Sequence, residues 1–262
     1  MTPTLRALLL CLAIVTFWPA AAAFGQTGLT ADSSVNATGT VPSVPVTSYL
    51  TSSGPVLNSP EIMISNANGS ASASGSVQFG SISGDVSVTG NGGATNNAGE
   101  ASFEGIWNDT LTVTSTTLAP DTTVDLLFTM TYNFSTVCSG PNGSPSEEAE
   151  FEAGSQNVTA SNTTCNPTSQ GTQTLNLVTF VGGTTDILGD LTLEPVAGEG
   201  SSVQEDPPVD FYIDSETAGA SYTTASGTNY STPISPTPEP STFGLFGLGL
   251  LGVIAFRKKA VA

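Results

Sequence analysis

Apolar and polar residues alternate along much of the chain between residues 61 and 214. The clearest case is residues 124–134, where every second side chain is apolar or aromatic. A period of two places such side chains on one face of a β-strand. Shorter runs of this kind recur at intervals, separated by Gly, Pro and Asn. Their residue ranges are 77–82, 85–89, 101–107, 111–113, 147–153, 175–181 and 209–213.

This pattern predicts an all-β fold, namely an antiparallel β-sandwich of the jelly-roll or Ig-like kind. We expect one sandwich domain over residues 61–214, a length that is ample for a single core. Residues 24–60 are rich in Thr, Ser, Val and Pro and predict an extended linker or edge strands. Residues 215–237 become polar and proline-rich, which predicts a spacer that builds no core.

The N-terminal residues 1–23 have the organisation of a secretory signal peptide. Arg6 provides the positive charge, residues 7–17 are apolar, and small alanines end the segment. We therefore predict cleavage after Ala23 and export of the remaining chain.

Residues 238–262 combine three features in a fixed order. A short polar motif, Pro238, Glu239 and Pro240, precedes an uncharged apolar run over residues 243–256. As a helix this run would be about 21 Å long, which is short for a bilayer core of ~30 Å and suits a transient single transmembrane anchor. Its apolar side chains are Phe243, Leu245, Phe246, Leu248, Leu250, Leu251, Val253, Ile254 and Phe256. Three cations, Arg257, Lys258 and Lys259, follow and would stay on the cytoplasmic side.

This order of features resembles the PEP-CTERM sorting signal of Gram-negative bacteria. The resemblance implies recognition and processing by an exosortase, a membrane-embedded enzyme. It also implies delivery to the cell surface or the extracellular space, often together with exopolysaccharide. Two looser patterns resemble the bodies of PEP-CTERM proteins: residues 103–113, which include Trp107-Asn108-Asp109, and residues 225–230. A generic β-sandwich sequence would explain these two patterns equally well.

Charge is divided sharply along the chain. All four basic residues lie in the two end signals, and all 22 acidic residues lie between Arg6 and Arg257 in a chain without histidine. Residues 7–256 therefore form a polyanion with no cationic side chain, which excludes nucleic acid as a partner because nothing neutralises phosphate. An anionic polysaccharide would be repelled as well, unless divalent metal ions bridged the two.

The same composition limits catalysis and cofactors. Without His or Lys in the body, a Ser-His-Asp or Cys-His arrangement and a Schiff-base lysine are excluded. Paired carboxylates could hydrolyse a glycoside, but nothing in the sequence selects a pair, so we predict a protein that is not an enzyme. We expect no cofactor. Asp206, Asp210 and Asp214 are weak candidates for calcium, although a solvated strand face explains them more simply.

After signal-peptide removal two cysteines remain, Cys138 and Cys165. In an oxidising compartment they predict one disulfide, with two free thiols as the alternative.

We therefore predict an exported protein of the cell surface or extracellular matrix. The alternative is a carbohydrate-binding β-sandwich module of the same matrix, with Trp107 or Tyr212 as the aromatic contact for sugar.

Overall fold

The computed structural model describes residues 28–36, 46–52, 54–66, 69–91, 99–165 and 168–231. All regular structure in these residues is β-strand, and among them no helix has the length and hydropathy that a membrane span requires. The predicted signal peptide with Ala23 and the predicted C-terminal helix lie outside the described residues.

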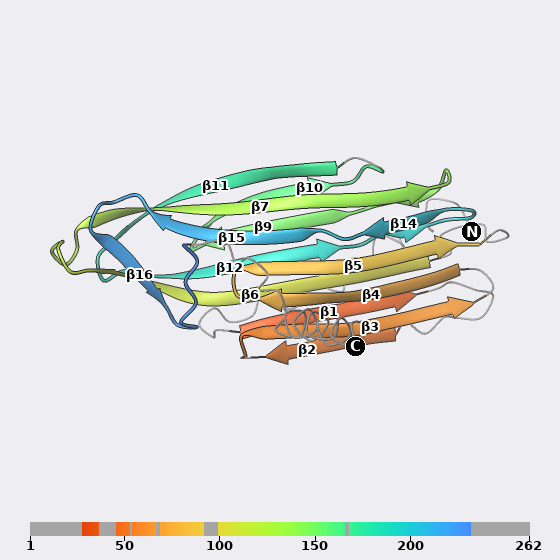
Figure 1. Ribbon diagram of the computed structural model, residues 1–262, viewed down its shortest axis with the longest axis horizontal. Coiled ribbons are helices and arrows are strands. Elements are labelled where there is room, and N and C mark those ends of the chain that lie inside the picture. Colours follow the sequence, from red (N-terminus) through yellow and green to blue (C-terminus); the bar gives the residue numbers. More distant parts are fainter. Residues whose placement is uncertain are drawn as a thin grey trace, which may run out of the picture.

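The strands form two antiparallel sheets that pack as a β-sandwich, which confirms the all-β, antiparallel part of the predicted fold class. Sheet A contains β1 Gly28–Asn36, β2 Val46–Ser52, β6 Gly99–Ser115, β8 Gly143–Ser144, β9 Glu147–Ala153, β10 Gln156–Asn162, β12 Thr184–Leu193, β13 Val196–Ala197 and β16 Ala220–Thr224. Sheet B contains β3 Val56–Asn66, β4 Gly69–Gln78, β5 Ser81–Gly90, β7 Thr123–Ser139, β11 Thr168–Phe180, β14 Ser202–Glu205 and β15 Pro208–Ser215. The strands run along the long axis of the molecule, with β11 near one margin and β2 near the other (Figure 1).

Sheet A has the order β10-β9-β12-β6-β1-β2, and sheet B has the order β11-β7-β14-β5-β4-β3. Some positions in this order are filled by two shorter strands that follow one another along the same neighbour. In sheet B, β14 and β15 share the space between β5 and β7, each pairing with a different part of both neighbours. In sheet A, β16 pairs with the end of β6 at residues 111–115, beyond the part of β6 that pairs with β1. The central strand β6 is thus paired along both of its sides.

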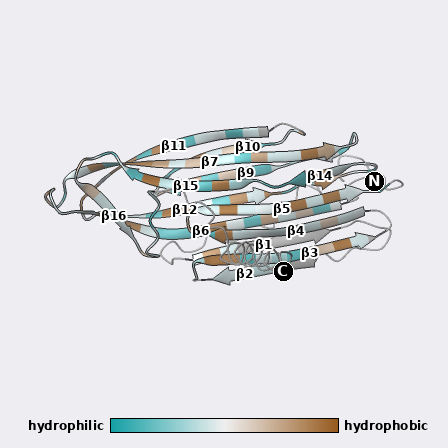
Figure 2. Ribbon diagram, in the orientation of Figure 1, coloured by the Kyte–Doolittle hydropathy of each residue, from teal (hydrophilic) through white to brown (hydrophobic). Residues whose placement is uncertain are grey.

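The core follows from the alternation in the sequence. Inward side chains of β6, among them Phe103, Trp107 and Leu111, are fully buried, and the intervening side chains are half-buried. Hydrophobic and hydrophilic residues are consequently interspersed along the strands (Figure 2). The small residues of β4 fit the same packing: a Cβ added at Gly75 would lie 2.2 Å from the ring of Phe103. Gly75 therefore leaves the space that this ring occupies.

Three sequence-based boundaries need correction. The predicted strand runs 101–107 and 111–113 are one strand, because the 17-residue β6 continues unbroken through Asn108 and Asp109. The strands before residue 61 include β1, which lies inside sheet A between β2 and β6 and is not an edge strand. Of the predicted spacer over residues 215–237, the described residues 215–231 are part of the sandwich, because β16 pairs with β6 and Tyr230 is buried. In each case pairing with distant strands supplies the stability that local apolar residues lack.

Candidate functional site

The segment over residues 225–230, which we call the C-terminal plug, directly follows β16 in the chain and is hydrogen-bonded to both sheets. At its start, the N–H of Ala225 donates to the carbonyl of Thr110 in β6 of sheet A (2.9 Å). At its end, the carbonyl of Tyr230 accepts from the N–H of Ile213 in β15 of sheet B (3.0 Å). The plug lies where β15 extends past its short pairing with β5, which ends at Asp210. It therefore covers the core at this place.

Asp109 holds the plug in position. This residue lies in the interior with 3% of its surface exposed, and hydrogen-bond donors surround its carboxylate. Oδ1 accepts from the N–H groups of Thr110 (2.8 Å) and Ser226 (3.0 Å). Oδ2 accepts from the hydroxyl of Ser226 and from the hydroxyl of Tyr230 (3.0 Å). Both oxygens of this buried carboxylate accept hydrogen bonds, and these bonds offset the free-energy cost of removing it from water.

Tyr230, the last residue of the plug, packs into the core. Its ring is 0% exposed and stacks on Trp107 with 5.2 Å between ring centroids. Edge-on contacts of Trp107 with Phe151 and Phe211 extend this aromatic cluster across the core. Burial, and then the neighbouring Asp109 carboxylate, raise the pKa of Tyr230 above its usual value. The phenol therefore stays protonated and remains a hydrogen-bond donor to Asp109.

The two looser sequence patterns thus meet in space, since the first contains Trp107 and Asp109 and the second is the plug. Sequence reasoning noted both patterns but assigned the plug to a spacer. Its only apolar residue of any size is Tyr230, so its burial leaves no periodic signal.

Cys138 and Cys165 form a disulfide in the structure, with 5.3 Å between their Cα atoms. Cys138 belongs to β7 of sheet B, and Cys165 follows β10 of sheet A. The bond therefore ties β7 to the connection between β10 of sheet A and β11 of sheet B.

The calcium candidates do not form a site in the described part of the chain. Asp206 and Asp214 are exposed and Asp210 is half-buried, and no group of three or more His, Cys, Asp or Glu residues that could hold a metal ion occurs among the described residues. The better description of these aspartates is a solvated strand face.

Acidic side chains gather instead on the outer face of sheet A, around Asp190 of β12. Register places Asp190 opposite Glu150 of β9, and Thr192 opposite both Glu148 and Glu104. Burial, followed by the charges of Glu104, Glu150 and Glu148, raises the pKa of Asp190 to about 8. This face therefore concentrates negative charge without a cationic side chain.

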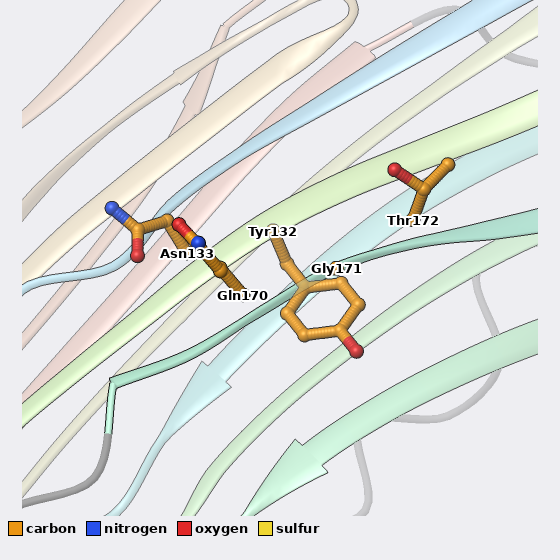
Figure 3. A pocket seen from close by; sticks show the side chains of 5 residues that line it. All are labelled: Tyr132, Asn133, Gln170, Gly171 and Thr172. Carbon is orange, nitrogen blue, oxygen red and sulfur yellow. The ribbon is translucent and has the colours of Figure 1, made fainter.

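The aromatic candidates for sugar binding differ in exposure. Trp107 is 0% exposed, so the prediction that it contacts sugar is wrong: its indole belongs to the core. Tyr212 is half-buried. An open pocket occurs elsewhere, between β7 and β11, lined by Tyr132, Asn133, Gln170, Gly171 and Thr172. Asn133 and Gln170 lie together there, and the ring of Tyr132 lies beside Gly171 (Figure 3).

Comparison with known families adds the decisive observation. The PEP-CTERM protein-sorting motif matches residues 236–259. The chain carries a PEP-CTERM sorting motif. The motif implies sorting by an exosortase and export across the membrane to the cell surface. In the comparisons with curated proteins and with solved structures, nothing matches this chain.

The motif includes Pro238, Glu239, Pro240 and the basic residues Arg257, Lys258 and Lys259, and it begins shortly after the plug. These residues and the apolar run between them lie outside the described residues. The described part of the chain ends at residue 231, directly after Tyr230.

Proposed function

We propose that this protein is a non-enzymatic component of the cell surface or extracellular matrix of a Gram-negative bacterium, associated with exopolysaccharide in a biofilm. The observation that carries the proposal is the position of the sorting motif, which follows a sandwich that is closed by its own C-terminal plug. The folded sandwich, including its plug, thus precedes the sorting motif in the chain. The body would remain after an exosortase removes the tail.

The length of the connection supports this arrangement. Seven residues, 231–237, separate Tyr230 from Pro238. Even a fully extended chain of this length spans no more than about 25 Å. The body would therefore lie close to the membrane while the exosortase acts. The apolar run 243–256 would serve as a transient anchor and would leave with the tail.

The charge of the body supports a structural role in a matrix. Residues 7–256 contain no Lys, Arg or His, so Ser-His-Asp and Cys-His arrangements and a Schiff-base lysine are excluded. The acidic outer face of sheet A would repel an anionic exopolysaccharide at low salt. Divalent cations such as calcium, which prefer carboxylate oxygens, would allow the two polyanions to associate.

A second candidate function is carbohydrate binding at the pocket between β7 and β11. Asn133, Gln170 and Thr172 place amide and hydroxyl groups that suit sugar hydroxyls on the outer face of sheet B there, whereas the ring of Tyr132 lies on the inner face beside Phe134. Glycan-array binding by the wild type that is lost in Gln170→Ala and kept in Tyr212→Ala would support this function. Absence of binding would favour the purely structural role.

The test of the proposed function is the intact mass of the surface protein from cells with and without the exosortase. We expect the mature protein to have lost both ends, near Ala23 and near Pro240, and the exosortase-deficient strain to retain the tail. A mature surface form that still contains residues 243–262 would contradict the proposal. Co-purification of the mature form with exopolysaccharide, tested with and without a calcium chelator, addresses the matrix role separately.

A further inference from the structure

Two buried glutamates, one in each sheet, lie beside Thr136 of β7. Glu147 begins β9 in sheet A and is 1% exposed, and Glu205 ends β14 in sheet B and is 0% exposed. Thr136 of β7 lies between them: it is the register partner of Glu205, and its hydroxyl donates to Oε2 of Glu147 (2.8 Å). One carboxyl group therefore comes from each sheet.

Hydrogen-bond donors satisfy only one oxygen of each glutamate. Oε2 of Glu147 accepts from Thr136 and from the side-chain amide of Asn162 (2.6 Å). Oε1 of Glu205 accepts from the N–H of Ser146 (2.8 Å). The remaining two atoms, Oε1 of Glu147 and Oε2 of Glu205, are buried and have no hydrogen-bond partner. Such unpaired buried oxygens are rare in folded proteins and need a physical explanation.

The chain offers no cation to compensate the pair. The groups that act on Glu205 are the N–H of Ser146 and the carboxylates of Glu147 and Glu194, and those that act on Glu147 are the neutral donors Asn162 and Thr136. Lys, Arg and His are absent from residues 7–256. Two ionised carboxylates here would be desolvated and would repel each other.

We propose that Glu205 is protonated in the folded protein and donates this proton from Oε2 to Oε1 of Glu147, so that one proton links sheet A to sheet B. The single hydrogen bond satisfies both unpaired oxygens. Glu147 is the acceptor because two donors on its Oε2 favour its ionised form, whereas Glu205 accepts only one N–H. Burial, assisted by Glu147 and Glu194, raises the pKa of Glu205 to about 8, which agrees with this assignment.

The proton makes the link between the sheets sensitive to pH. The pKa of Glu205 is about 8 in the folded protein and 4.5 as a model value. Its contribution to stability is therefore fully present below about pH 4.5 and is lost as the pH rises to about 8. In that interval one such proton changes the unfolding equilibrium constant about tenfold per pH unit. Resting on the proposed function, the exported protein would meet the pH of its surroundings and would hold together most firmly in mildly acidic ones.

Urea unfolding of the mature protein between about pH 5.5 and pH 9 tests the assignment. Glu205→Gln keeps the shape of the side chain, and its amide can donate to Oε1 of Glu147 at every pH. We expect the unfolding of this variant to release about one proton fewer than that of the wild type. Below pH 8 its unfolding equilibrium constant should therefore change by a factor about ten times smaller per pH unit. An unchanged pH dependence in Glu205→Gln would overturn the proposal, whatever the result of the exosortase experiment.

The matched control is Asp190→Asn, because Asp190 also has a pKa of about 8 but lies on the outer face of sheet A. We expect each substitution to remove its own proton and the double variant to remove both. A double variant that removes no more than Asp190→Asn alone would assign the whole effect to the outer face and would contradict the proposal.

Carbon-13 NMR of the glutamate carboxyl groups gives a second readout. We expect the Glu205 carboxyl signal, assigned with Glu205→Gln, to be that of a carboxylic acid at about pH 6, and to titrate at lower pH in Glu147→Gln, which lacks the neighbouring charge. An ionised Glu205 at pH 6 would overturn the proposal. So would calcium that stabilises the wild type but not Glu205→Gln, because a metal ion would then occupy the place of the proton.

Discussion

Buried carboxylates occur at two places in this sandwich, and their surroundings differ. Asp109 has donors on both oxygens, from Thr110, Ser226 and Tyr230. Glu147 and Glu205 each have one oxygen without a partner. In a body without basic side chains, hydrogen-bond donors or protons stand where a cation would otherwise compensate a buried carboxyl group. The comparison indicates that Asp109 is a structural anchor for the plug, whereas the glutamate pair holds a proton.

Asp109→Ala should have the largest effect. It leaves two N–H groups and two hydroxyls in the plug region without an acceptor, and we expect a loss of about 3–5 kcal/mol in the free energy of unfolding. Chemical denaturation of the mature protein measures this loss. Glu216→Ala, at an exposed acidic position, is the control and should change stability by less than ~0.5 kcal/mol. Equal stabilities of the two variants would show that Asp109 anchors nothing.

The disulfide lies close to the glutamate pair. Cys138 and Cys165 are within three residues of Thr136 and Asn162, whose side chains donate to Glu147. The double substitution to serine removes a cross-link over a sequence separation of 27 residues. We expect a loss of about 3–4 kcal/mol in the chain-entropy description. Reduction of the disulfide in the wild type should lower the free energy of unfolding, measured in urea, by the same amount. A free energy of unfolding that reductant leaves unchanged would show that this bond does not stabilise the body.

Tyr230→Phe sharpens the account of the plug, because it keeps the ring on Trp107 and removes only the hydroxyl that donates to Asp109. Loss of one hydrogen bond to a charged acceptor should cost about 1–2 kcal/mol, less than Asp109→Ala. A loss as large as that of Asp109→Ala would mean that the Tyr230 hydroxyl carries most of the anchoring and that the donors on Ser226 contribute little.

Asp190→Asn should have the opposite sign, and near pH 5 its effect should be the smallest of the four. The pKa of Asp190 is about 8 in the fold and 3.8 as a model value, so its contribution to stability is lost as the pH rises between those values. The stability of the variant relative to the wild type should therefore increase from pH 5 to pH 8, by up to about tenfold in the unfolding equilibrium constant per pH unit, because a charge among Glu104, Glu148 and Glu150 is removed. Thermal melts at the two pH values measure this, and a variant that is less stable at pH 8 would contradict the account of this face.

The sequence predicted those parts of the fold that carry their own periodic signal. In β7 and β9 the apolar residues alternate cleanly, and both strands are where the pattern placed them. β4 and β16 escaped detection because their stability comes from partners: the Ala and Gly residues of β4 pack under Phe103, and the polar β16 pairs with β6. Local composition does not reveal such pairing.

The candidate sites divide in the same way. Pro238, Glu239 and Pro240 could be recognised because a sorting signal is read as a linear sequence. The role of Asp109 could not, because Asn-Asp is also a common turn sequence and its acceptor function depends on Ser226 and Tyr230, more than a hundred residues away. The burial of Trp107 likewise depends on Tyr230, so its exposure could not be judged from its neighbours in the chain.

The central claim is that the plug belongs to the folded body and that the sorting tail begins after it. Chymotrypsin digestion of the native mature protein, followed by mass spectrometry, tests this most directly, because it cuts after exposed aromatic residues. Tyr49 is 65% exposed and Tyr230 is 0% exposed. We predict cutting after Tyr49 long before any cutting after Tyr230, and rapid cutting after Tyr230 in Asp109→Ala. Cutting after Tyr230 in the wild type as fast as after Tyr49 would contradict the claim.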